Sequence, residues 1–133
     1  MKRYHTTTDA LPGEEWRPLP GRPGGYEVSS FGRVRRPAFE APRRRGGTQH
    51  YRAFALKAYR RNGAPVVQLS VGRGRHRAVR VARLVAEAFL PPAPRGAVLD
   101  HLDGDRGDVR PENLRWKAPL RISSALLRRL LRA

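Results

Sequence analysis

The sequence lacks cysteine altogether. This absence excludes disulfide bonds, thiolate zinc sites and thiol nucleophiles, so any bound metal must be held by Asp, Glu, Asn or His side chains. The sequence also lacks an apolar run near the roughly 20 residues that a membrane span needs. No apolar stretch follows the N-terminal Met1–Tyr4, as it would in a secretory signal. We therefore expect an intracellular, cytoplasmic protein that does not enter a membrane.

Acidic residues are scarce as well. The 133 residues include 11 Asp and Glu against 28 Lys and Arg, which gives a formal net charge of +17. Only Lys2, Lys57 and Lys117 are lysines, so the other basic residues are arginines. Such a charge favours a polyanionic partner, and guanidinium groups suit phosphates and the guanine edge, which favours nucleic acid. The alternative is a solvated arginine surface without a partner, as occurs in proteins of high-GC organisms and thermophiles.

Apolar residues make up 39% of the chain, which is enough for one modest core. Short β-type stretches at 26–28 and 33–35 predict a tight strand–turn–strand unit. The segment 37–49 combines Pro, Gly and three consecutive arginines, and predicts a flexible basic linker or a loop that contacts phosphates. Three further stretches predict a short antiparallel meander, namely 53–59, 65–71 and 76–81.

Two segments have the apolar spacing of amphipathic helices. The first is 82–90, which two prolines end. The second is 120–133, where apolar residues recur every four positions beside arginines. Its apolar positions include Ile122, Leu126 and Leu130.

A polar loop at 100–113 concentrates acidic side chains around one histidine. Oxygen ligands suit a hard cation such as Mg²⁺, and a histidine supplies a base that titrates near neutrality. DNA hydrolysis needs both, because the base activates water and the cation stabilises the phosphorane and the leaving oxygen. The alternative is a solvated acidic turn in which the aspartates cap the backbone. The residues concerned are Asp100, His101, Asp103, Asp105 and Asp108.

Residues 100–116, DHLDGDRGDVRPENLRW, resemble the HNH family pattern His-(Ile/Leu)-Asp-Gly-Asn/Asp followed by Glu-Asn-Leu-x-Trp. The segment VARLVAEAFLPP from Val81 resembles the helix that precedes this motif in phage and group I intron HNH endonucleases. The segment EEWRPLPGRPGGYEVSSFGRVRR, which ends at Arg36, resembles the small DNA-binding module that often precedes HNH domains. These resemblances cover most of 15–122 and imply a homing-endonuclease-like protein, consistent with a phage or bacterial origin.

The resemblance implies an α+β chain with three parts. They are a nuclease-associated DNA-binding β module at 10–36, a basic linker at 37–50 and a β-rich HNH domain at 51–133. In the ββα-metal core of that domain, two strands and a helix hold a single divalent cation, expected to be Mg²⁺ or Mn²⁺, at the scissile phosphate. The implied activity is site-preferring hydrolysis of phosphodiester bonds in double-stranded DNA.

The resemblance also implies roles for individual residues. Asp100 is expected to be a metal ligand and His101 the general base that deprotonates water. Asn113 matches the asparagine that braces the loop and orients the histidine, which keeps the base positioned for proton transfer.

Two positions depart from the family pattern. Ile122 stands where relatives place the second protein ligand, an Asn or His, and Ala82 stands where relatives often have His. An isoleucine side chain cannot coordinate a cation, although Ser123, Ser124 or an aspartate of the loop could replace the missing ligand. The alternative function is therefore a degenerate HNH protein that binds nucleic acid or a nucleoprotein without cutting it.

DNA contacts are expected from the edge of the upstream module and from the arginine run that follows it. Trp16 and Trp116 could stack on bases, but we expect both to anchor the core. A third interpretation, a ribosome-associated or phage structural protein, follows from charge alone and leaves the acidic loop unexplained. The expected DNA-binding residues are Tyr26, Ser29, Ser30, Arg33, Arg35, Arg43, Arg44 and Arg45.

Overall fold

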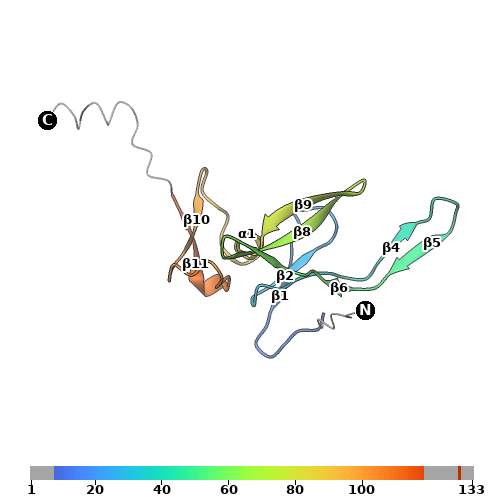
Figure 1. Cartoon of the computed structure of the whole chain (residues 1–133), viewed down its shortest axis with the longest axis horizontal. Helices are drawn as coiled ribbons and strands as arrows, with labels where there is room; N and C mark the ends of the chain where they lie inside the picture. The colour runs from blue at the N-terminus through green and yellow to red at the C-terminus, as the bar shows by residue number, and fades with distance from the viewer. Residues whose placement is uncertain (1–7, 119–128, 130–133) are drawn as a thin grey trace.

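The computed structural model describes residues 8–118 and Arg129. This part of the chain consists of small antiparallel sheets around one α-helix, α1 (Val81–Phe89) (Figure 1). A 3-10 helix, η1 (Pro111–Asn113), lies between the last two strands. The strands are β1 (Trp16–Pro18), β2 (Glu27–Ser29), β3 (Val34–Arg36), β4 (Phe39–Pro42), β5 (Thr48–Tyr51), β6 (Phe54–Ala55), β7 (Tyr59–Arg61), β8 (Ala64–Gly72), β9 (Arg75–Arg80), β10 (Val98–His101) and β11 (Leu114–Lys117).

The predicted strand–turn–strand unit is confirmed, since β2 and β3 pair antiparallel. β1 and β6 extend it to a four-stranded sheet in the order β1-β2-β3-β6. The turn between β2 and β3 is closed by Ser29, whose Oγ accepts hydrogen bonds from the backbone N–H of Phe31 at 3.1 Å and of Arg33 at 3.0 Å. A serine at this position therefore replaces backbone bonds that a tight turn leaves unmade.

The basic segment 37–49 differs from the prediction of an irregular linker or loop. It contains β4 and the first half of β5, which form a hairpin that projects from the rest of the protein (Figure 1). The rings of Phe39 and Tyr51 stack across the hairpin with centroids 4.6 Å apart, and the guanidinium of Arg36 lies 3.7 Å from the Phe39 ring centroid. These contacts favour strand pairing in a segment whose Pro and Gly content predicts coil.

The predicted meander is confirmed for its second and third strands, which are found as β8 and β9 and pair antiparallel. Its first predicted strand, 53–59, is wrong, because that segment holds β6, which pairs with β3, and the third strand of the sheet is β7. The predicted helix over 82–90 is found as α1, which ends before Pro91 and Pro92. The second predicted helix, 120–133, lies outside the described residues apart from Arg129. Within 8–118 and Arg129, no helix is long and apolar enough to cross a membrane.

One core cluster joins the upstream module to the region of the acidic loop. It contains residues of β2 and β3, of β8 and β9, of α1, and of the segment that precedes and begins β11. The division into parts at 10–36, 37–50 and 51–133 stays a prediction, but the two outer parts share this core. Its members are Leu19, Tyr26, Val28, Val34, Val67, Leu69, Val79, Val81, Ala82, Leu84, Val85, Val109 and Leu114.

Gly32 marks the point of closest approach between the module and the loop. Its backbone has a φ of +81°, and a Cβ at this position would lie 2.3 Å from Cγ2 of Val109. We expect Gly32→Ala to lower the free energy of unfolding by about 3 kcal/mol, because it adds a clash to backbone strain. Thermal or urea unfolding measures this. Gly63 is the matched control, since its φ is +78° and nothing lies near its Cβ position. Gly63→Ala should cost about 1 kcal/mol, and equal losses in the two variants would contradict a close packing contact at Gly32.

Candidate active site

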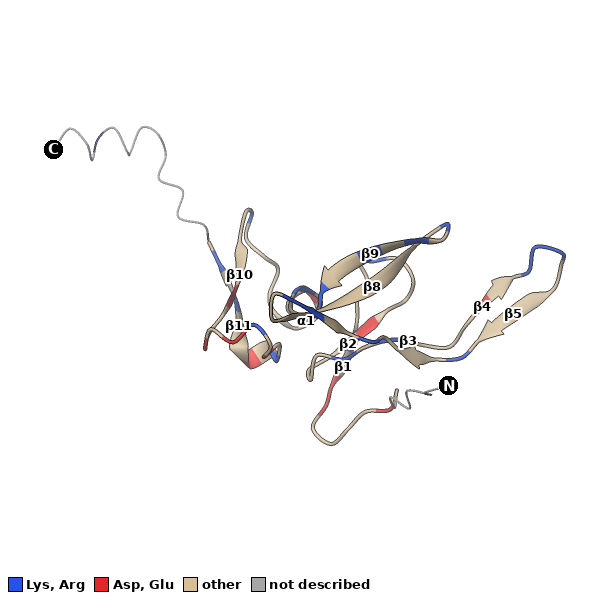
Figure 2. Cartoon of the chain, viewed as in Figure 1, with Lys and Arg blue, Asp and Glu red and all other residues tan. Residues whose placement is uncertain are grey.

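The acidic loop connects the two strands of a small hairpin. β10 and β11 pair antiparallel, with Asp100 opposite Arg115 and His101 opposite Leu114. Successive side chains of a strand point to opposite faces, so Asp100 and His101 leave the hairpin in different directions. Acidic residues gather at this end of the molecule (Figure 2). The first two residues of the predicted loop thus belong to a strand.

Asn113 holds the two ends of the loop together. Its Nδ2 donates hydrogen bonds to Oδ1 of Asp103 at 3.0 Å and to the backbone carbonyl of Asp108 at 2.9 Å. Its Oδ1 accepts one from the backbone N–H of Asp103 at 3.2 Å, and its own carbonyl accepts one from the N–H of Leu102 at 2.8 Å. Asn113 is only 6% exposed, so these bonds are shielded from water and fix the loop.

His101 lies between the loop and the core. Its side chain is half-buried, and its Nε2 is shielded from solvent without a hydrogen-bond partner among the described residues. No hydrogen bond joins it to Asn113 in this part of the chain, so the predicted orienting effect of Asn113 stays a prediction.

The aspartates of the loop already have partners within the protein. Oδ1 of Asp103 accepts a hydrogen bond from the N–H of Asp105 at 2.8 Å, and Oδ1 of Asp105 accepts one from the N–H of Gly107 at 2.9 Å. Hydrogen bonds from Arg110 hold the pKa of Asp108 at about 2. The capping role considered for these residues is therefore realised.

Asp100 is paired with a cation of the protein itself. Nε and Nη2 of Arg115 each lie 3.0 Å from Oδ2 of Asp100. Arg115 was not among the predicted site residues, and the pairing of β10 with β11 brings it opposite Asp100. A carboxylate suits a divalent cation, but the described residues contain no group of three His, Asp or Glu side chains that could hold one. Ile122 lies outside the described residues.

Three of the predicted DNA-binding residues make contacts inside the protein. Tyr26 and Ser29 are 3% and 0% exposed. The hydroxyl of Tyr26 accepts a hydrogen bond from the N–H of Ser70 at 2.9 Å, and Oγ of Ser30 accepts one from the N–H of Glu15 at 2.9 Å. Their contact with DNA stays a prediction, whereas their support of the fold is visible.

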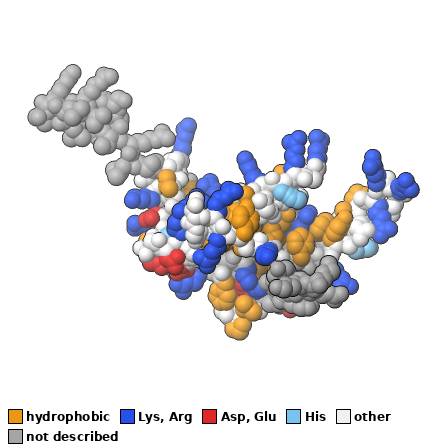
Figure 3. Space-filling view, in the orientation of Figure 1, with side chains coloured by type: hydrophobic (Ala, Val, Ile, Leu, Met, Phe, Trp, Pro, Cys, Tyr) orange, Lys and Arg blue, Asp and Glu red, His pale blue; other side chains and the backbone are white. Residues whose placement is uncertain are grey.

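The arginine run has a different environment. Arg43, Arg44 and Arg45 occupy the turn of the β4–β5 hairpin, where all three are exposed. Within the described chain they form no ion pair. Figure 3 shows basic side chains at the end of this hairpin, far from the acidic loop. These arginines are available to an anionic partner.

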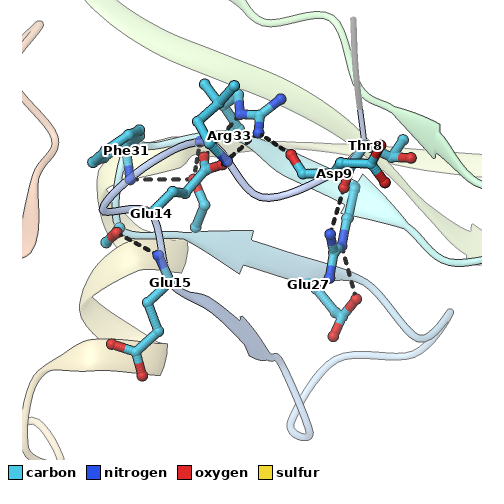
Figure 4. A network of polar contacts seen from close by, with 11 residues as sticks. Thr8, Asp9, Glu14, Glu15, Glu27, Phe31 and Arg33 are labelled. Carbon is cyan, nitrogen blue, oxygen red and sulfur yellow. Dashed lines mark hydrogen bonds and ion pairs between the residues drawn. The ribbon is translucent and has the colours of Figure 1, made fainter.

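Arg33 and Arg35 are each held by a carboxylate, that of Glu14 and that of Glu27 (Figure 4). Arg33 binds Glu14 through two nitrogens, with Nε 2.8 Å from Oε2, and Nε of Arg35 lies 2.9 Å from Oε1 of Glu27. Their guanidinium carbons lie 5.1 Å and 4.0 Å from the Trp16 ring centroid. This network fixes the module, and Trp16 is half-buried within it. Trp116 is half-buried too, with the guanidinium of Arg83 5.8 Å from its ring centroid.

The bridge to Arg33 makes stability depend on pH. Hydrogen bonds from Arg33 lower the pKa of Glu14 from 4.5 to about 2, and the Glu14 side chain is fully buried. A lowered pKa stabilises the fold above the unfolded value near 4.5, and this contribution is lost as the pH falls towards 2. We expect Glu14→Gln to lower the free energy of unfolding by about 2–3 kcal/mol at pH 7 and to flatten the acid dependence in that window.

Urea unfolding at pH 7, 4 and 3 measures both effects. Glu15→Gln is the control, because its partner Arg17 is 42% exposed and Glu15 is 61% exposed. An exposed pair should contribute less than about 1 kcal/mol. If Glu14→Gln retained the full acid dependence of the wild-type protein, the bridge would not be its source.

Comparisons with known proteins agree with this arrangement. Residues 79–119 match the HNH endonuclease family, and residues 14–70 match the NUMOD4 motif. The chain is similar to a solved structure of the HNH homing endonuclease I-HmuI, which binds and cleaves DNA. The two are 30% identical with a TM-score of 0.57, and the match covers 78% of this chain and 52% of the other.

This chain therefore spans about half the length of that enzyme. No curated protein matches it significantly. HNH nucleases use divalent metal ions. The two family matches lie in the order that the sequence resemblance implied, and they confirm it. The chain therefore contains an HNH endonuclease domain at residues 79–119, preceded by a NUMOD4 motif at residues 14–70.

Proposed function

We propose that this protein is a DNA endonuclease that hydrolyses phosphodiester bonds in double-stranded DNA, with His101 as the general base. The observation that carries the proposal is the position of His101, within the HNH match and at the end of a strand whose following loop is fixed by Asn113. A base held at the edge of a fixed loop loses less rate to misorientation than a mobile one.

The proposed step requires few groups of this chain. His101 removes a proton from water as the water oxygen bonds to phosphorus and the bond from phosphorus to the leaving 3′ oxygen breaks, and Asn113 keeps the loop beside it in place. Asp100 would hold the divalent cation, for which we propose Mg²⁺ or Mn²⁺, and the cation would supply positive charge for the phosphate and leaving oxygen. Together with these residues, we propose a ββα-metal core over about 97–132 and DNA contacts from the β4–β5 turn.

The experiment is incubation of supercoiled plasmid with Mg²⁺ or Mn²⁺, with and without chelator. Nicked or linear DNA should appear only when free metal is present. If the plasmid stayed intact and showed a mobility shift under every condition, the protein would bind DNA without cutting it, and the proposed cleavage would be refuted.

One observation favours a second candidate, a DNA-binding HNH protein that does not cut. Asp100 is ion-paired to Arg115. Among the described residues, Asp100 and two further His, Asp or Glu side chains do not form a group that could hold a metal ion. The identity of residue 122 separates the two candidates, because relatives place a ligand where this chain has isoleucine.

We expect Ile122→Asn or Ile122→His to tighten Mn²⁺ binding and to increase nicking, since either side chain can donate to a cation. Calorimetry measures the affinity for Mn²⁺, and the plasmid assay measures nicking. Ile122→Leu is the control, because leucine adds no group that could bind a cation. A loss of about 1–3 kcal/mol of stability without a gain in metal binding would assign the position to packing. The binding protein would then replace the nuclease as the proposal.

A further inference from the structure

The turn between β8 and β9 lies between the two family matches, which end at residue 70 and begin at residue 79. Three arginines of this turn and strand, Arg73, Arg75 and Arg77, are exposed and make no ion pair with the described residues. Neither family match covers them. We refer to them as the β8–β9 arginines.

The turn itself is not optimised for stability. Arg73 has a φ of +52°, a left-handed backbone that a non-glycine residue rarely adopts. The turn between β7 and β8 has Asn62 at the same φ of +52°, and asparagine tolerates this conformation well. Arginine has no such advantage, so its presence at Arg73 indicates a role for the side chain.

The sequence around this turn supplies no acidic residue. Between Glu40 and Glu87 the sequence contains no acidic residue. Outside this segment, arginines are commonly held by carboxylates, as Arg22 is by Glu87 at 2.7 Å and Arg115 is by Asp100. The basic residues between the two glutamates are Arg43, Arg44, Arg45, Arg52, Lys57, Arg60, Arg61, Arg73, Arg75, Arg77, Arg80 and Arg83.

The β8–β9 turn and the β4–β5 turn project towards the same side of the molecule (Figure 1), and basic side chains cover both ends (Figure 3). Each turn ends a ribbon of two antiparallel strands that holds its arginines on a preformed support, since β7 pairs with β8 only at its start, Ala64–Val66. β8 has nine residues and β9 six, so this ribbon reaches well beyond the core. Two such basic ends fit a long polyanion better than a small one.

We propose that the β8–β9 arginines form a second phosphate-contacting site for double-stranded DNA, in addition to the β4–β5 turn. The inference rests on the proposed function. The β8–β9 arginines bind the sugar–phosphate backbone and fix the orientation of the duplex on the protein. Contacts of this kind position DNA without reading its sequence.

The test compares the full-length wild-type protein with two triple variants, by fluorescence anisotropy on a duplex of about 30 base pairs. The first variant is Arg73→Gln, Arg75→Gln and Arg77→Gln. The second removes the same charge from arginines that are ion-paired to carboxylates, as Arg17→Gln, Arg22→Gln and Arg83→Gln. Dissociation constants are measured between about 50 and 200 mM salt, where phosphate contacts have their largest effect.

We expect the first variant to bind DNA at least about tenfold more weakly at 100 mM salt, with a salt slope smaller by about 2–3, since each phosphate contact contributes about 0.9. The ion-paired control should keep the wild-type slope. Thermal unfolding should show that the first variant is folded. If it is unfolded, the single variant Arg75→Gln takes its place in the test, with an expected change in salt slope of about 0.9.

The proposal is overturned if the first variant keeps the wild-type slope, or if the control loses as much as the first variant. It is also overturned if the first variant loses affinity for duplex RNA and not for duplex DNA. Failure of the wild-type protein to bind any duplex would instead refute the proposed function.

Discussion

Replacing His101 by alanine should reduce the rate of DNA cleavage by about 10²–10⁴, the usual contribution of a general base. The expectation follows from the position of His101 within the HNH match and from the hydrogen bonds of Asn113 that hold the adjacent loop. The rate should be measured at saturating protein, where a change in DNA affinity does not alter it. Raising the pH should restore part of the lost rate, because hydroxide then replaces the missing base.

His50→Ala is the control for this substitution. His50 lies on β5, is exposed, and has its Nδ1 2.8 Å from Oε1 of Glu40, remote from the acidic loop in the sequence. We expect it to cut at the wild-type rate. Equal cleavage by His101→Ala and the wild-type protein would remove His101 from the mechanism, even if the protein proved to be a nuclease.

DNA affinity should fall steeply with salt. If the arginines of the β4–β5 turn and the β8–β9 arginines each contact a phosphate, the slope of log K against log salt should be about −5. Affinity would then fall about 10³-fold between roughly 50 and 200 mM salt. The net charge of +17 and the segment without acidic residues between Glu40 and Glu87 are the reasons for this expectation.

The measurement is a series of equilibrium titrations with an unrelated duplex, so that sequence preference does not enter. A second duplex of a different sequence should give nearly the same slope as the first, because phosphate contacts are independent of sequence. A nearly flat dependence over this range would mean that few phosphates are bound. The arginines would then be a solvated surface, the alternative that composition alone leaves open.

Local patterns in the sequence predicted much of the fold. Alternation predicted the β2–β3 unit and the β8–β9 pair, and apolar spacing predicted α1, because each pattern reflects one element and one buried face. The β4–β5 hairpin was missed because its pairing depends on a stack between Phe39 and Tyr51, twelve positions apart. Composition records the prolines and glycines of such a segment and not the contact that organises it.

The sequence predicted which residues of the acidic loop lie close together, but not which contacts the side chains of the site make. The acidic loop was identifiable because its residues are neighbours in the sequence. The burial of Tyr26 was not, because its partner is the backbone of Ser70, 44 positions away. For the same reason, the ion pairs that hold Arg33 and Asp100 could not be read from the sequence, since each depends on how strands pair.

The most direct test of the nuclease is single-turnover cleavage of supercoiled plasmid at saturating protein, started by adding Mg²⁺ and stopped by adding chelator. Under these conditions every plasmid is bound, so the measured rate reports the chemical step. We predict that nicked DNA accumulates after Mg²⁺ is added and that accumulation stops at once with chelator. Plasmid that stays fully bound and intact in Mg²⁺ and in Mn²⁺ would contradict the proposal that this protein is a nuclease.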